Sequence, residues 1–155
     1  RLIPDAIKSF YKNETVLIRN PNAIRPWQFV LEPLRGYMML AEKLYNAEYI
    51  YSSGWNFGPN NDNVRNVEWI IKNLSEKWGP HASWKFEKEE SEILHEANYL
   101  KLDITKAKHD LNWHPLLNIN DTLELIIEWY KSFEKEENMH KVSLNQIIKY
   151  QNLIK

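Results

Sequence analysis

Three prolines fall within residues 19–33, RNPNAIRPWQFVLEP, and they restrict what this part of the chain can form. Proline fixes φ and lacks an N–H, so it is disfavoured inside a helix or a central strand. The run also sets Arg25 and Trp27 on either side of Pro26, placing a cation and a large ring beside a stiffened backbone. A strand over 25–30 is still possible here, with Pro26 near its start, where the missing N–H does least harm.

Apolar residues outside this run recur at helical or strand spacing. The helical spacing predicts helices at 2–13, 34–45, 66–79, 106–113, 118–136 and 144–155. Runs of β-branched and aromatic residues predict strands at 15–20, 25–30, 49–60, 81–88 and 99–103. Leu34, Tyr37 and Met38 are expected on the buried face of their helix, and Asp121 and Ser143 begin capping-box patterns for the last two helices.

The order of these elements mixes helices with short strands. It lacks the regular strand–helix–strand alternation that an independent doubly wound sheet requires. A length of 155 residues is enough for one domain with a modest core. We therefore expect a small α+β or α/β layer of mixed helices and short strands, and of the two we favour α/β.

Charge and composition exclude several classes of partner. The net charge of −1 provides no global field for nucleic acid or an anionic membrane, so any bound anion must meet a local cluster of cations. No apolar stretch approaches the roughly 20 residues needed to span a bilayer. The chain has no cysteine, which excludes disulfides and thiol nucleophiles and fits a cytoplasmic protein.

Motifs for catalysis, cofactor binding and metal binding are missing from the sequence. HEANY at 95–99 begins like a zinc-protease motif, but Tyr99 stands where the second histidine is needed. The four glycines form neither G-x-G-x-x-G nor a P-loop, and there is no G-x-S-x-G. No tyrosine is followed by lysine at the fourth position. We therefore assign no catalytic, cofactor-binding or metal-ligating residue.

What remains is a set of polar residues placed next to apolar or stiffened sequence: Arg1, Arg25, Asn56, His95 and Glu96. Each also has a purely structural interpretation, because buried polar groups are usually hydrogen-bonded for stability. Arg25 could pair with Glu32, Asn56 could cap a buried backbone group, and His95 could be an ordinary surface residue.

Several segments, taken in order, resemble a known family. RLIP, IRPWQFVLEPLRGYMMLAEKLY, GWNFGPN, HEANYLKLD and LNWHPLLNINDTLELIIEWY are similar to the C-terminal half of the CDP-glucose 4,6-dehydratases. These enzymes belong to the extended short-chain dehydrogenase/reductase superfamily, which modifies nucleotide-activated sugars. The L-x-W-x-P pattern occurs across the superfamily, whereas IRPWQ-V-EPL with HEA-YLKLD is narrower and indicates the CDP-glucose branch.

The resemblance implies a role in converting CDP-glucose to CDP-4-keto-6-deoxyglucose, in deoxysugar biosynthesis such as that of lipopolysaccharide O-antigen. It implies that NAD is bound by an N-terminal half outside this sequence, which would carry the glycine motif and Tyr-x-x-x-Lys. The isolated segment is then expected to bind substrate weakly and to catalyse nothing.

The resemblance also implies residue roles. Arg25 would bind the substrate's pyrophosphate, Arg1 would lie near the diphosphate, and Leu2 would follow the nucleotide. Asn56 would help to order the site, and His95 and Glu96 would face the nucleotide. Physical chemistry supports the pyrophosphate-binding role of Arg25, because a guanidinium donates two parallel hydrogen bonds to paired phosphate oxygens. Nearby prolines also lower the conformational entropy that the backbone loses on binding. Trp27 is expected to pack beneath the stem of that arginine.

For domain organisation, the resemblance implies that residues 1–155 form one C-terminal substrate-binding region with a Rossmann half missing. About 32–62 would return to the edge of the missing Rossmann sheet, and the full-length enzyme could be a homodimer. Alternatives are another nucleotide-sugar dehydratase or epimerase, a non-catalytic binding module, and a structural aromatic-rich domain. A first residue of Arg1 rather than Met favours a piece of a longer protein.

Overall fold

The computed structural model describes residues 1–46, 48–87 and 98–154, and these form a mixed α/β structure. The described helices are α1 (Leu2–Tyr11), α2 (Leu31–Tyr45), α3 (Val67–Trp78), α4 (Thr105–Asp110), α5 (Ile119–Glu134) and α6 (Met139–Gln151). The strands are β1 (Val16–Ile18), β2 (Ile24–Arg25), β3 (Arg65–Asn66) and β4 (Trp84–Phe86), and two short 3₁₀ helices are η1 (Tyr49–Tyr51) and η2 (Asn61–Asn63). None of the described helices is long and apolar enough to cross a membrane.

The described strands form two small sheets. β1 and β4 are parallel, with Val16 opposite Trp84. β2 and β3 are antiparallel, with Ile24 opposite Asn66 and Arg25 opposite Arg65. Tyr99 adds an isolated parallel bridge to Ile24 at the other edge of β2.

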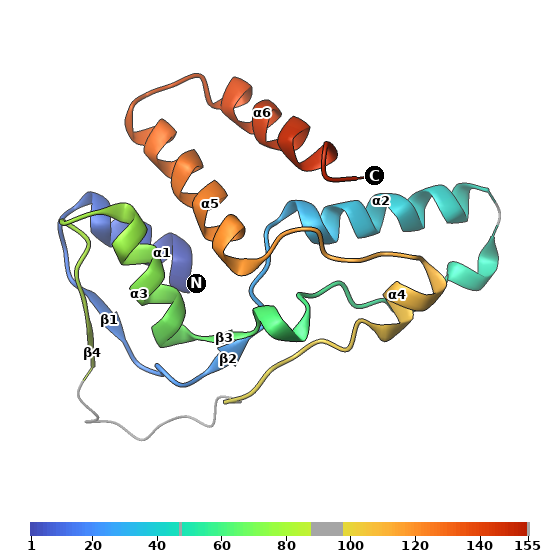
Figure 1. Cartoon of the computed structure of the whole chain (residues 1–155), viewed down its shortest axis with the longest axis horizontal. Helices are drawn as coiled ribbons and strands as arrows, with labels where there is room; N and C mark the ends of the chain where they lie inside the picture. The colour runs from blue at the N-terminus through green and yellow to red at the C-terminus, as the bar shows by residue number, and fades with distance from the viewer. Residues whose placement is uncertain (47, 88–97, 155) are drawn as a thin grey trace.

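One core lies where α1, α3 and α5 meet the β1–β4 sheet, on the left of Figure 1. Its fully buried side chains include Ile7, Phe10, Ile71 and Leu123. Each of these stabilises the fold by about 1.5–3 kcal/mol relative to an exposed position. The ring of Trp78 lies 6.0 Å from that of Phe10, which extends this core to the end of α3.

A second core lies between α2 and α4, at the other end of the molecule (Figure 1). The rings of Phe57 and Trp113 meet there edge to face with centroids 5.0 Å apart. A Cβ atom on Gly36 would lie only 2.5 Å from the Phe57 ring. The absence of a side chain at Gly36 therefore lets α2 approach the segment around Phe57 closely.

A buried carboxylate ties α2 to the C-terminal part of the chain. Glu32 is 1% exposed, and its Oε1 accepts bonds from the backbone N–H groups of Leu116 and Leu117, both at 2.8 Å. The Tyr150 hydroxyl donates to Glu32 Oε2 at 2.7 Å. Burial, followed by this hydrogen bond to Glu32, raises the pKa of Tyr150 above its ordinary value. The bonds fix α6 and the 116–117 connection against the first turn of α2.

Several expectations from the sequence are wrong at the level of individual elements. The strand expected over 25–30 ends at Arg25, and residues 49–60 contain η1 followed by irregular backbone. Of the strand expected at 99–103, only the bridge at Tyr99 forms. An extended segment becomes a strand only when a neighbour bonds its backbone, and the described residues provide no such neighbour for 52–60.

Two other expectations are also corrected. The capping residues are Asn118 for α5 and Asn138 for α6, not Asp121 and Ser143. The α2 helix forms, but Leu34, Tyr37 and Met38 are 44%, 57% and 73% exposed, because the described residues cover that face only in part, where the ring of Tyr37 meets that of Phe57.

Candidate functional site

Arg25 lies at the end of β2, where the chain enters the proline-restricted run. Its side chain is half-buried, and its Nη1 donates to the carbonyl oxygen of Ile24 at 2.9 Å. Its own carbonyl accepts a bond from the Trp27 backbone N–H at 2.9 Å, closing a tight turn around Pro26. The backbone around this cation is thus held by local hydrogen bonds in addition to proline.

Two side chains fasten the run to neighbouring segments. The Trp27 indole Nε1 donates to the carbonyl of Arg65 in β3 at 3.0 Å. The Gln28 amide Nε2 donates to the carbonyl of Phe57 at 2.7 Å. The expected packing of Trp27 beneath the stem of Arg25 stays a prediction, and the indole hydrogen bond joins the run to β3. These bonds make residues 25–28 a rigid platform.

A second arginine, Arg65, is paired with Arg25 across β2 and β3. Arg65 is the register partner of Arg25 and is also half-buried. Its Nη1 donates to the carbonyls of Asp62 and Val64, both at 2.8 Å, and its guanidinium carbon lies 5.1 Å from the centroid of the Trp69 ring. Sequence reasoning missed this residue, although an arginine directly before the helix at 66–79 was visible.

Arg1 and Leu2 lie at the start of α1. Arg1 is exposed, and its backbone carbonyl accepts a bond from the Asp5 backbone N–H at 3.2 Å. Leu2 is half-buried and packs against the first core.

Of the other predicted residues, Asn56 lies in the described part of the chain. Asn56 is exposed, and its Nδ2 donates to the carbonyl of Asp103 at 3.2 Å. This is a bond to a backbone group, as the structural interpretation expects, although Asp103 is exposed and not buried. His95 and Glu96 lie outside the described residues, so their predicted roles stay predictions.

The pairing of Arg25 with Glu32, which the sequence offered as a structural interpretation, is wrong. The carboxylate oxygens of Glu32 bond to two backbone amides and to Tyr150, and Glu32 has no bond to Arg25. The buried carboxylate is therefore already satisfied within the second half of the chain. Because all of these partners lie within the fold, Glu32 has a structural role.

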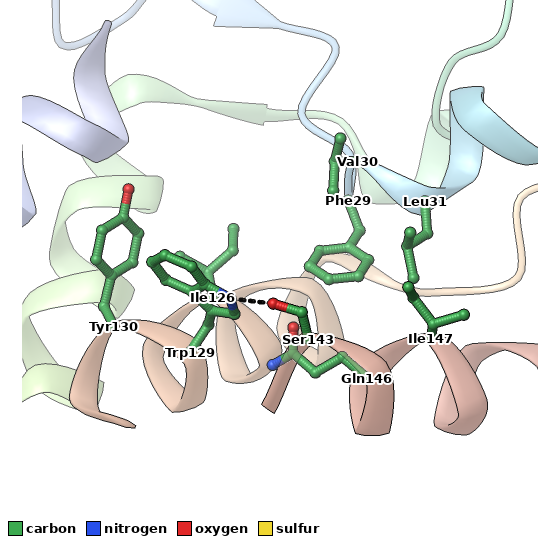
Figure 2. A pocket seen from close by; sticks show the side chains of 9 residues that line it. All are labelled: Phe29, Val30, Leu31, Ile126, Trp129, Tyr130, Ser143, Gln146 and Ile147. Atoms are coloured by element: carbon green, nitrogen blue, oxygen red, sulfur yellow. Dashed lines mark hydrogen bonds between the residues drawn. The ribbon is translucent and has the colours of Figure 1, made fainter. Parts of the chain in front are cut away.

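The described residues also line a partly open apolar pocket of about 300 Å³ between α5, α6 and the start of α2 (Figure 2). Ser143 accepts a bond from the Trp129 indole at 3.0 Å inside it. The lining residues are Phe29, Val30, Leu31, Ile126, Trp129, Tyr130, Ser143, Gln146 and Ile147. Because none of them is cationic, this pocket does not suit a diphosphate.

Metal and dinucleotide sites have no basis in the described geometry. Across 1–46, 48–87 and 98–154, no group of three or more His, Cys, Asp or Glu side chains could hold a metal ion. The four glycines of the chain do not form the G-x-G-x-x-G motif that binds the phosphates of a dinucleotide. These residues therefore do not fit NAD.

Comparison with solved structures defines the class of fold. The chain aligns with part of a UDP-glucose 4-epimerase from Thermotoga maritima, solved with UDP-glucose, with a TM-score of 0.64. The alignment covers 86% of this chain and 40% of that one at 19% sequence identity, so it shows the fold alone. The chain therefore has the fold of part of a nucleotide-sugar epimerase.

Comparison with curated proteins identifies a particular relative. The chain is homologous to CDP-glucose 4,6-dehydratase of Salmonella typhimurium, with 45% identity over 150 residues. The match covers 97% of this chain but only 41% of the relative's length. This confirms the resemblance to an extended short-chain dehydrogenase/reductase. No family model matches the chain.

Proposed function

We propose that this chain is the nucleotide-sugar-binding part of a longer NAD-dependent CDP-glucose 4,6-dehydratase. The support is 45% identity across nearly the whole chain to an enzyme of that name, of which the chain spans 41%. The fold shared with an epimerase solved with UDP-glucose supports a nucleotide-sugar ligand.

The observation that carries the proposal is the fixed position of Arg25. It lies at the end of β2 on a backbone stiffened by Pro26 and fastened by Trp27 and Gln28. A diphosphate carries about two negative charges, and a guanidinium pairs with its oxygens through parallel, charge-assisted hydrogen bonds. A cation that is already positioned loses less conformational entropy on binding, so more of the interaction energy contributes to affinity.

The other predicted residues take supporting roles in this proposal. Arg1 adds positive charge near the diphosphate, Leu2 follows the nucleotide, and Asn56 orders the strand-like segment beside the sugar. Asn56 already fixes this segment to the carbonyl of Asp103. His95 and Glu96 are proposed to face the nucleotide.

The chemistry of the reaction is proposed to occur elsewhere in the full-length enzyme. NAD would be held by an N-terminal part and would supply oxidation at C4 of the sugar and hydride return at C6 after loss of water. Hydride transfer and proton abstraction both need groups at contact distance. The chain described here contributes binding and orientation of the substrate, and no catalytic residue.

The exposed face of α2 supports a packing partner in such an enzyme. Tyr37 and Met38 of α2 are 57% and 73% exposed, and Ile50 of the following η1 is 86% exposed. Large apolar side chains grouped on one face usually mark an interface. We propose that residues 32–62 pack against the nucleotide-binding part and complete the edge of its sheet. The full-length enzyme could also dimerise.

The test is a binding and turnover comparison on the full-length protein. We expect CDP-glucose to bind more tightly than UDP-glucose or dTDP-glucose, and to be converted to a 4-keto-6-deoxy sugar with NAD present. A markedly tighter dTDP- or UDP-sugar would instead support another nucleotide-sugar dehydratase or an epimerase. Binding without any turnover would support a non-catalytic binding module.

A further inference from the structure

We propose that Arg65 is a second diphosphate-binding residue that acts together with Arg25. The two guanidiniums would each contact one phosphate, so that the site selects a nucleoside diphosphate group over a monophosphate. This inference rests on the proposed function, because it adds a residue and a selectivity to the same site.

Strand register brings the two cations together. Arg25 and Arg65 are directly opposite each other in the antiparallel β2–β3 pair. Opposite residues project from the same face of such a pair, with Cβ atoms about 4.5–5.5 Å apart. An anion with two charged groups that binds on this face can therefore meet one guanidinium at each group, and both contacts are electrostatically attractive.

Arg65 is positioned before any ligand arrives. Its Nη1 is used by the carbonyls of Asp62 and Val64, and its guanidinium lies over the Trp69 ring at 5.1 Å. Its Nε and Nη2 donate to no residue within 1–46, 48–87 or 98–154. The side chain is therefore restrained while donors remain for a second phosphate, which lowers the entropy cost of binding.

The nearby N-terminus of α3 is not the better candidate for this role. Helix N-termini bind anions through their unpaired backbone N–H groups. Here the N–H groups of Val67 and Glu68 donate to the carbonyls of Ala23 and Pro21 at 3.0 and 2.9 Å. The Trp69 N–H donates to the capping Asn66 side chain at 2.9 Å. These backbone donors are already occupied, so the contact to a second phosphate is left to a side chain.

The test compares CDP with CMP on the full-length protein by calorimetry, using wild type and Arg65→Gln. We expect wild type to prefer CDP, and Arg65→Gln to weaken CDP binding by about 10- to 100-fold, as for a lost charge-assisted contact. CMP affinity should change by less than about 3-fold, since one phosphate needs only Arg25. Arg65→Lys keeps the charge without the fork and should fall between wild type and Arg65→Gln.

Arg19→Gln is the matched control. Arg19 is an exposed arginine that pairs with Glu87 beside the other sheet, so its removal should leave both affinities unchanged. Equal losses for CDP and CMP in Arg65→Gln would indicate a structural role and overturn the inference, as would an unchanged preference for CDP. If wild type binds neither CDP nor CDP-glucose, the proposed function itself fails.

Discussion

Removing one hydroxyl at Tyr150 tests the buried carboxylate that joins the two ends of the chain. Tyr150 is 4% exposed, and its hydroxyl donates to Glu32 Oε2 at 2.7 Å and accepts a bond from Arg35 at 3.3 Å. Tyr150→Phe keeps the ring and its packing, so little apolar contact is lost. It leaves one oxygen of a 1%-exposed carboxylate without its donor.

The expected loss follows from that change. Hydrogen bonds to charged groups contribute about 1.5–3 kcal/mol, and an unpaired buried acceptor costs a similar amount. We expect Tyr150→Phe to lower the free energy of unfolding by about 2 kcal/mol. The two backbone amides that bond Oε1 remain, so the loss should stay below the about 3–5 kcal/mol of a fully broken buried charge pair.

The assay is urea unfolding of the chain, followed by tryptophan fluorescence. Tyr45→Phe is the control, because Tyr45 is 91% exposed and its hydroxyl makes no hydrogen bond to a described residue. It should change stability by less than about 0.5 kcal/mol. A double-mutant cycle with Glu32→Gln should give a coupling energy above about 0.5 kcal/mol. A loss at Tyr150 no larger than at Tyr45 would refute the reasoning.

Three further predictions concern the fold, its pH dependence and the site. Gly36→Ala should destabilise by about 1 kcal/mol in urea unfolding, because the clash with Phe57 outweighs the gain in helix propensity, while Gly54→Ala, with no atom within 4 Å, should be tolerated; a stabilised Gly36→Ala would contradict this. Because the pKa of Tyr150 is raised on folding, its contribution is complete below the ordinary tyrosine pKa and is lost as pH rises above about 10, so Tyr150→Phe should flatten the alkaline loss of stability. Arg25→Ala in the full-length enzyme should weaken CDP-glucose binding by about 1.5–3 kcal/mol, and unchanged affinity in calorimetry would exclude its role.

Elements with strong local signals could be predicted from the sequence. The helices α1, α3 and α5 have clear apolar periodicity and form nearly where expected. The two strands β1 and β4 were also predicted, because β-branched and aromatic residues cluster there. In each case the residues that pack together are set by spacing along one short segment.

Elements that depend on distant partners could not be predicted. Strand pairing decides that β2 stops at Arg25 and that residues 52–60 remain irregular, and no local pattern shows which neighbours are present. The exposure of Met38 has the same origin, since periodicity gives an apolar face but not what covers it.

The candidate site was predicted only in part. The proline-restricted run indicated Arg25 as a candidate residue, and local hydrogen bonds hold the backbone around it. Arg65 was missed because its place opposite Arg25 comes from strand register, which a single sequence does not show. Likewise, Glu32 gave no sign that its partners would be Tyr150 and two backbone amides far along the chain.

We propose above all that Arg25 binds the diphosphate of a nucleotide sugar. The most direct measurement is a crystal structure of the full-length protein with CDP-glucose and NAD. The account predicts that the Arg25 guanidinium lies within hydrogen-bond distance, about 2.7–3.2 Å, of a phosphate oxygen. A well-ordered CDP-glucose whose phosphates are held by other residues, with the Arg25 side chain directed away, would contradict it.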